Sequence, residues 1–156
     1  MYIMNYQFHL DHLTVIRNKF VEALDTLSLE KLLVIPQGCN NNMLWQIGHC
    51  AVSQQRLMYT YSGLPIHLDN AFVELFKIGT SPKNWTSTPD VAAVRAALIS
   101  TVDHLKVDVE NGVFKEYKSF KTSAGLVLNS FEEAFTYSNY HEGVHVGNLE
   151  IFRRIV

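Results

Sequence analysis

Apolar residues recur at spacings of three and four along four stretches of the chain, which is the period that places side chains on one face of an α-helix. Along about residues 5–27, the apolar face consists of Leu13, Ile16, Phe20, Leu24 and Leu27. From about Asn42 to Tyr61, one apolar line consists of Leu44, Ile47, Ala51 and Met58, and a neighbouring line of Trp45, His49 and Val52. These patterns predict two helices of about 20 residues.

Two further stretches keep the same period in the second half of the chain. After "STPDVAAV", the apolar face consists of Val91, Val94, Leu98, Thr101, Val102 and Leu105. After "SFEE", it consists of Phe131, Phe135, Ser138, His141, His145, Leu149, Phe152 and Val156. For the third helix we expect Thr88 as N-cap with Pro89 at the first helical position, and for the fourth a capping box of Ser130 and Glu133.

The connections between these stretches predict only short elements. Residues 28–41 contain Pro and Gly and predict a loop with a helical turn, residues 63–88 include "DNAFVELFKIG" as a short extra helix, and residues 113–129 suggest a ragged hairpin. Four amphipathic helices pack most simply as an antiparallel bundle. We therefore predict an all-α protein, an up-and-down four-helix bundle with long inter-helix loops, as a single domain over residues 1–156.

Composition and charge narrow the classes of partner. The chain has 156 residues, 47% of them hydrophobic, and a formal net charge of −2. That balance predicts no nucleic-acid partner, because phosphate binding requires a positive surface. Neither a secretory signal nor an apolar run long enough to cross a bilayer is found, and Cys39 and Cys50 are expected to be free thiols. We expect a cytoplasmic protein with no membrane contact.

The fourth stretch contains His141-Glu142-Gly143-Val144-His145, which matches the H-E-x-x-H motif of many zinc proteases. Spacing of four residues on a helix lets both imidazoles reach one ion, and a shared cation would compensate for burying them in an apolar stripe. The alternative is two histidines with a structural role only. Only eleven residues follow His145, so a protease would have no downstream helix to supply its third ligand.

A third ligand must therefore come from upstream, and His49 is the best placed because it lies near the middle of a helix beside Trp45 and Val52. Its structural alternative is a core histidine that donates to a backbone carbonyl. His9 and His12 are candidates for a fourth ligand or a supporting contact. Glu142 is a candidate catalytic residue, although its position about 100° from His141 suggests that it faces solvent or a neighbouring subunit.

Two segments, "NNMLWQIGHCAVSQQRLMY" and "SFEEAFTYSNYHEGVHVGNL", resemble the DinB/YfiT-like superfamily of small four-helix-bundle metalloproteins. Members carry an Asn or Ser, an apolar pair with Trp and a His on the second helix, and H-x-x-x-H followed by hydrophobic-Gly-polar on the last. Here these positions are Asn42, Leu44-Trp45 and His49, then His141, His145 and Val146-Gly147-Asn148. Asn148 departs from the pattern, since Gln or Glu is frequent there.

The resemblance implies that His49, His141 and His145 bind one divalent transition metal ion, zinc or nickel first and iron or copper as alternatives, with positions left for water or substrate. It also implies a homodimer and either hydrolysis or thiol transfer on a small-molecule substrate, with a low-molecular-weight thiol as a possible cofactor. The alternative is a metal-binding or dimeric interaction module without turnover.

Overall fold

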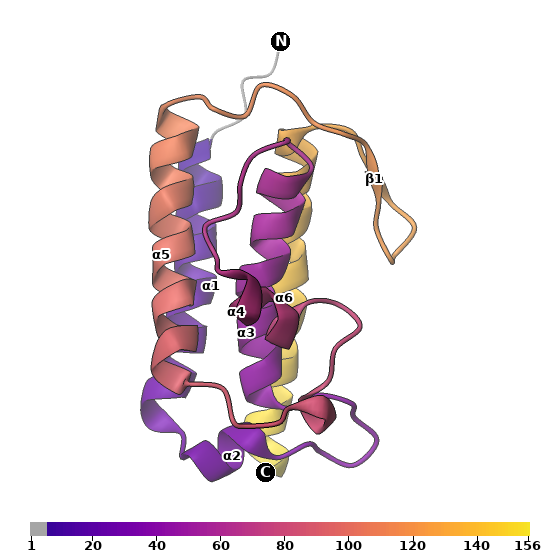
Figure 1. Cartoon of the computed structure of the whole chain (residues 1–156). Helices are drawn as coiled ribbons and strands as arrows, with labels where there is room; N and C mark the ends of the chain where they lie inside the picture. The colour runs from indigo at the N-terminus through magenta and orange to yellow at the C-terminus, as the bar shows by residue number, and fades with distance from the viewer. Residues whose placement is uncertain (1–5) are drawn as a thin grey trace.

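The computed structural model describes residues 6–156, and four long helices lie side by side in it (Figure 1). They are α1 (Tyr6–Thr26), α3 (Met43–Gln55), α5 (Val91–Glu110) and α6 (Phe131–Ile155). Helices α1 and α3 each pack against both α5 and α6. The predicted all-α class is thus confirmed. The predicted start of the first helix at residue 5 lies outside the described residues.

The helices do not alternate in direction as an up-and-down bundle would. The rings of Tyr6 and Phe131 are 5.8 Å apart at one end of α1 and α6, and Glu22 pairs with Arg153 at 3.5 Å near the other end. These two helices are therefore parallel, whereas the first and last helices of an up-and-down bundle are antiparallel. After α3 the chain runs back along the bundle before α5 begins, so α3 and α5 also point the same way (Figure 1). The predicted alternation was wrong because residues 61–90 cross the length of the bundle.

The connections contain the short elements that the sequence predicted. They are α2 (Leu29–Leu33), α4 (Asn70–Phe76), β1 (Phe120–Lys121) and β2 (Val127–Leu128). The two strands form an antiparallel hairpin in which Phe120 lies opposite Leu128. Two further elements were not predicted: the 3₁₀ turn η2 (Pro82–Asn84) and the π-helical segment η1 (Arg56–Thr60), into which α3 continues directly.

Side-chain caps fix where the helices begin. Asn42 accepts a hydrogen bond from the Trp45 amide at 2.8 Å, and Ser130 accepts one from the Glu133 amide at 3.2 Å, as predicted. The start of α5 differs from the prediction, because Asp90 and not Thr88 is its N-cap. Asp90 has an extended backbone and its carboxylate accepts from the Ala92 amide at 2.9 Å, so Pro89 lies before the helix.

The interior of the bundle is apolar along most of its length, and its largest fully buried side chains include Tyr59, Phe20, Phe76 and Phe135. Within residues 6–156, no helix is both long enough and apolar enough to span a bilayer. Cys39 and Cys50 are free thiols, as expected.

Candidate metal centre

Three imidazoles converge between α3 and α6. The ring centre of His49 lies 5.3 Å from that of His141 and 5.3 Å from that of His145, and the last two are 4.7 Å apart. One nitrogen from each ring lies within 4.8 Å of the others. Because metal–nitrogen bonds are about 2 Å long, this spacing suits ligands of a single ion. The predicted convergence of the three rings is confirmed, and their role as metal ligands stays a prediction.

His49 is held by the short helix α4. Its Nδ1–H donates to the carbonyl oxygen of Phe76 at 2.8 Å, which leaves Nε2 as the unprotonated nitrogen. Gly48 permits this approach, because a Cβ atom there would lie 2.5 Å from the Phe76 ring. Trp45 stacks on the other side of the imidazole, with ring centres 4.5 Å apart. The predicted carbonyl contact of a core histidine is therefore present, and it orients the ring without consuming Nε2.

His145 is oriented from α3 by an amide. The side-chain oxygen Oε1 of Gln46 accepts from Nδ1 of His145 at 2.9 Å and from the side-chain amide of Asn148 at 3.0 Å. Nε2 of His145 is thereby left unprotonated. Asn148, which departs from the family pattern, thus acts on His145 through Gln46. Contacts of this kind fix the tautomer and orientation of metal-binding histidines.

His141 differs from the other two, since its Nδ1 is buried and has no hydrogen-bond partner among residues 6–156. Burial lowers the pKa of all three imidazoles, to about 4 for His141 and about 3 for His145, with nearby histidines adding to the shift at these two. All three are consequently neutral at pH 7, which is the form that binds metal ions. An unpartnered buried nitrogen in an all-imidazole donor set fits a transition metal ion.

The other histidines lie outside this group. Within the described part of the chain, the only set of three ligand-type residues within reach of one ion is His49, His141 and His145. Nε2 of His9 is 3.3 Å from the hydroxyl of Thr136, and His12 is exposed on the first helix. The structure therefore does not support a fourth ligand from His9 or His12.

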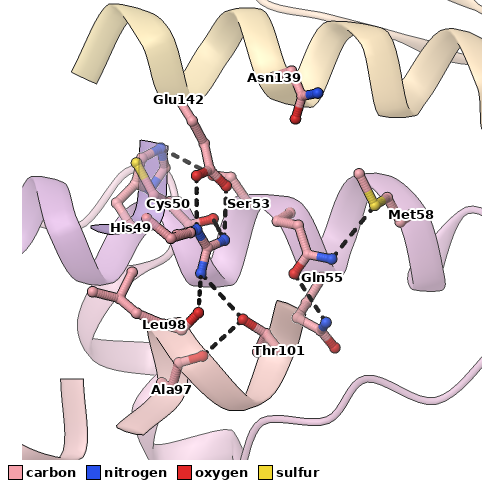
Figure 2. Close-up of polar contacts among 12 residues, drawn as sticks. His49, Cys50, Ser53, Gln55, Met58, Ala97, Leu98, Thr101, Asn139 and Glu142 are labelled. Carbon is pink, nitrogen blue, oxygen red and sulfur yellow. Dashed lines mark hydrogen bonds and ion pairs between the residues drawn. The ribbon is translucent and has the colours of Figure 1, made fainter. Parts of the chain in front are cut away.

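Glu142 faces the interior of the bundle, not solvent or another subunit, and that expectation was wrong. It is completely buried, and its two oxygens accept from Nε and Nη2 of Arg17 at 2.7 Å each. Nη1 of Arg17 also donates to the carbonyl of Leu98 and to the hydroxyl of Thr101. Figure 2 shows Glu142 directed from α6 toward Leu98 and Thr101 on α5. Burial raises the pKa of the Glu142 carboxyl, and the Arg17 guanidinium opposes that rise.

A cavity of about 240 Å³ opens beside the histidines. His49 and His141 form part of its wall, together with Ser53 from α3 and Tyr137 from α6. The hydroxyl of Ser53 lies 3.1 Å from Nε2 of His49, which places it at the boundary between the cavity and the histidines. The β1–β2 hairpin contributes Phe120 to the wall and the loop after α4 contributes Ile78, so four separate parts of the chain build the cavity.

Sequence reasoning overlooked several residues that shape this region. Arg17 could have been found as the partner of Glu142, because each of the two falls at a three- or four-residue spacing within the apolar stripe of its helix. Gln46 lies one helical turn before His49 and is also detectable by spacing. The carbonyl of Phe76 has no sequence signature, since every residue carries one.

Comparison with known families adds to this geometry. The sequence model that describes the DinB superfamily matches residues 12–149, a range that includes both histidine-bearing helices and the hairpin. A search of curated proteins found no match. The chain therefore belongs to the DinB superfamily.

Proposed function

We propose that His49, His141 and His145 hold one divalent transition metal ion and that the protein is a metal-dependent enzyme acting on a small molecule. Membership of the DinB superfamily and the three-histidine cluster fit a metal-binding DinB-like protein. The observation that carries the proposal is that two of the three rings also line a cavity. Three nitrogen ligands beside an open space are typical of catalytic sites, whereas structural sites are closed by a fourth protein ligand.

The cavity also supports the proposal of an enzyme over its main alternative, a metal-binding module without turnover. Such a module would need neither an open coordination position nor an adjoining pocket. The candidates for a closing fourth ligand, His9 and His12, are not part of the cluster found among residues 6–156. This arrangement favours turnover over storage or structural metal binding.

The same residues favour thiol transfer over hydrolysis. Bound there, a divalent ion would act as a Lewis acid, lowering the pKa of water or of a low-molecular-weight thiol. Hydrolases with the H-E-x-x-H motif use its Glu as the general base, yet among the described residues no Asp or Glu lines the cavity. Glu142, the sequence candidate, has both oxygens occupied by Arg17. We therefore assign Glu142 a structural role and propose a thiol S-transferase, with a hydrolase as the alternative.

The decisive experiment measures metal content and activity on the same preparation. Protein purified without a histidine tag is loaded with zinc or nickel, gel-filtered, and assayed with several small thiols and electrophiles beside ester and amide substrates. We expect about one equivalent of metal and turnover that requires both metal and thiol. Retention of less than about a tenth of an equivalent would refute the metal site. Turnover of esters without thiol would instead select the hydrolase.

We also propose a homodimer formed through an exposed apolar stripe on α6. Its members are Tyr140, Val144, Ile151 and Ile155, each 45–62% exposed. Exposed apolar surface of this kind marks interaction sites. Light scattering after gel filtration should show a dimer that Ile151→Asp converts to monomer, while Ile99→Asp, at an exposed apolar residue of α5, leaves it intact. A monomeric wild-type protein would refute the dimer.

The remaining proposals concern location and partners. The free thiols Cys39 and Cys50 fit a reducing cytoplasm, and we propose that the protein is cytoplasmic. The net charge of −2 supports a small molecule over nucleic acid as the ligand.

A further inference from the structure

The wall of the cavity beside the histidines is mostly apolar and contains one residue with a permanent positive charge. Arg56, the first residue of η1, is part of its wall, and among the described residues no acidic side chain lines it. Arg56 also forms no ion pair with any residue of the range 6–156. A guanidinium without a counter-charge at the wall of a pocket is a ready site for an anion.

The position of Arg56 relative to the histidines follows from helix geometry. His49, Ser53 and Arg56 are separated by four and then three residues, so they share one face of α3 and its continuation η1. Seven residues correspond to about 10 Å along the axis.

The rest of the wall is mostly apolar or aromatic. Leu57, Ile78 and Phe120 line it without any charged group, and Tyr61 and Tyr137 add aromatic rings. At about 240 Å³ the cavity is smaller than the roughly 300–1,000 Å³ typical of pockets for drug-sized ligands. It therefore suits a compact molecule with an apolar body and a single charged end.

We propose that the cavity binds a small organic carboxylate, with the carboxylate on Arg56 and the apolar body between Ile78, Phe120 and Tyr137. The opposite end of the molecule then reaches His49 and His141. A carboxylate matches the planar fork of a guanidinium, which donates two parallel hydrogen bonds to it. The proposal specifies the substrate of the proposed enzyme and rests on that function for the reaction, but the contact with Arg56 requires no metal ion.

Binding of hydrocinnamate and of its primary amide, a neutral analogue of the same shape, tests the proposal. Titration calorimetry and ligand-observed NMR are run on the metal-free and the zinc-loaded protein. We expect the carboxylate to bind both forms and the amide to bind at least about tenfold more weakly, since charge-assisted hydrogen bonds are about twice as strong as neutral ones.

Three variants test whether the guanidinium of Arg56 binds the carboxylate. Arg56→Gln should weaken carboxylate binding about tenfold or more, and Arg56→Lys, which keeps the charge but loses the fork, should fall between Gln and wild type. Arg154→Gln is the matched control, because it removes one exposed arginine that lies 13 residues beyond His141 on α6, about 20 Å along the helix. Circular dichroism verifies that each variant is folded.

The outcomes separate this proposal from the proposed function. Equal binding of acid and amide, no binding of the acid at millimolar concentration, or equal effects of Arg56→Gln and Arg154→Gln would each overturn the Arg56 site. Binding that requires zinc and ignores Arg56→Gln would also overturn it, while supporting the metal site. Arg56-dependent binding by protein that retains no zinc would support the carboxylate site and refute the metal proposal.

Discussion

His141 and Glu142 are neighbours on α6, yet their side chains enter two regions whose hydrogen bonding differs. Both oxygens of Glu142 are bonded to Arg17, whose remaining donors reach Leu98 and Thr101 of α5. Nδ1 of His141 is buried beside a cavity and has no hydrogen-bond partner in the part of the chain that the structure describes. The region around Arg17 and Glu142 is charged, and both oxygens of Glu142 are hydrogen-bonded. The three imidazoles are neutral, and one of their nitrogens has no hydrogen-bond partner among residues 6–156.

Within one helix, this difference distinguishes a polar side chain that stabilises the fold, Glu142, from one that is available to bind a ligand, His141. Burying a charge is tolerable only when a partner compensates for lost hydration, and Arg17 with Glu142 meets that condition while joining α1, α5 and α6. Neutral imidazoles are cheaper to bury, so the bundle can leave a nitrogen unsatisfied where a ligand is to bind.

The largest effect is expected from Arg17→Met, which leaves the Glu142 carboxylate buried without a counter-charge. We expect a loss of about 3–5 kcal/mol in the free energy of unfolding, measured by urea denaturation. The double variant Arg17→Met/Glu142→Leu should recover most of that loss, because it removes both charges. This double variant keeps the test informative if the single variant does not fold.

Arg95→Gln provides the matched control, since it breaks an ion pair with Asp25 that is about half exposed. Exposed pairs contribute little to stability because solvent screens them, so Arg95→Gln should lower the free energy of unfolding far less than Arg17→Met. If Arg17→Met costs no more than Arg95→Gln, the Arg17–Glu142 pair does not stabilise the bundle.

The next effect is expected from His141→Ala, one residue away from Glu142. The affinity for zinc or nickel should fall by more than about 100-fold, because loss of a ligand exceeds the 10–100-fold effect of losing a supporting contact. The unfolding free energy of the metal-free protein should change by only about 1 kcal/mol. His104→Ala, at an exposed histidine outside the cluster, should leave metal affinity unchanged. Unchanged affinity in His141→Ala would remove this residue from the site.

A third prediction concerns pH. The pKa of His141 falls from 6.5 in an unperturbed chain to about 4 in the fold, so below pH 6.5 the unfolded protein binds a proton that the folded protein does not. The stability that burial of the neutral ring permits is fully present above pH 6.5 and is lost as pH falls toward 4. For this residue alone the loss is about 2 kcal/mol by pH 4.5.

Thermal unfolding of the metal-free protein across pH 4.5–7 measures this loss, and His141→Ala isolates the contribution of His141 from that of other groups. The variant should lose less stability than the wild type over the same range. Identical pH profiles would mean that the ring is not held neutral by burial.

The smallest effect is expected from Gly48→Ala, whose new Cβ would lie 2.5 Å from the ring of Phe76. Displacing Phe76 should cost about 1–3 kcal/mol of stability and, by weakening the bond from His49 to its carbonyl, about tenfold in metal affinity. Gly143→Ala is the control, because a Cβ there meets no atom within 4 Å. It should stabilise the helix by about 1 kcal/mol without affecting metal binding. Equal behaviour of the two variants would exclude a role for α4 in positioning His49.

The four long helices and the candidate metal-binding histidines could be predicted from the order of the residues alone. Helical period and caps such as Asn42 and Ser130 are local properties, so four helices and most of their ends followed from them. The spacing of His141 and His145 put both rings on one face of α6 before any packing was known. Arg17 and Glu142 also fall within apolar stripes, and their opposite charges could have predicted a buried pair.

The relative arrangement of the helices, the histidines and the cavity wall depends on tertiary contacts. The direction of α5 depends on the path of residues 61–90, which the helical period does not specify. The unprotonated state of Nε2 in His49 depends on a carbonyl from α4, and the cavity depends on a hairpin that lies more than sixty residues after α3 in the chain. Such contacts join residues distant in sequence through backbone groups and shape, so no local pattern of side chains records them.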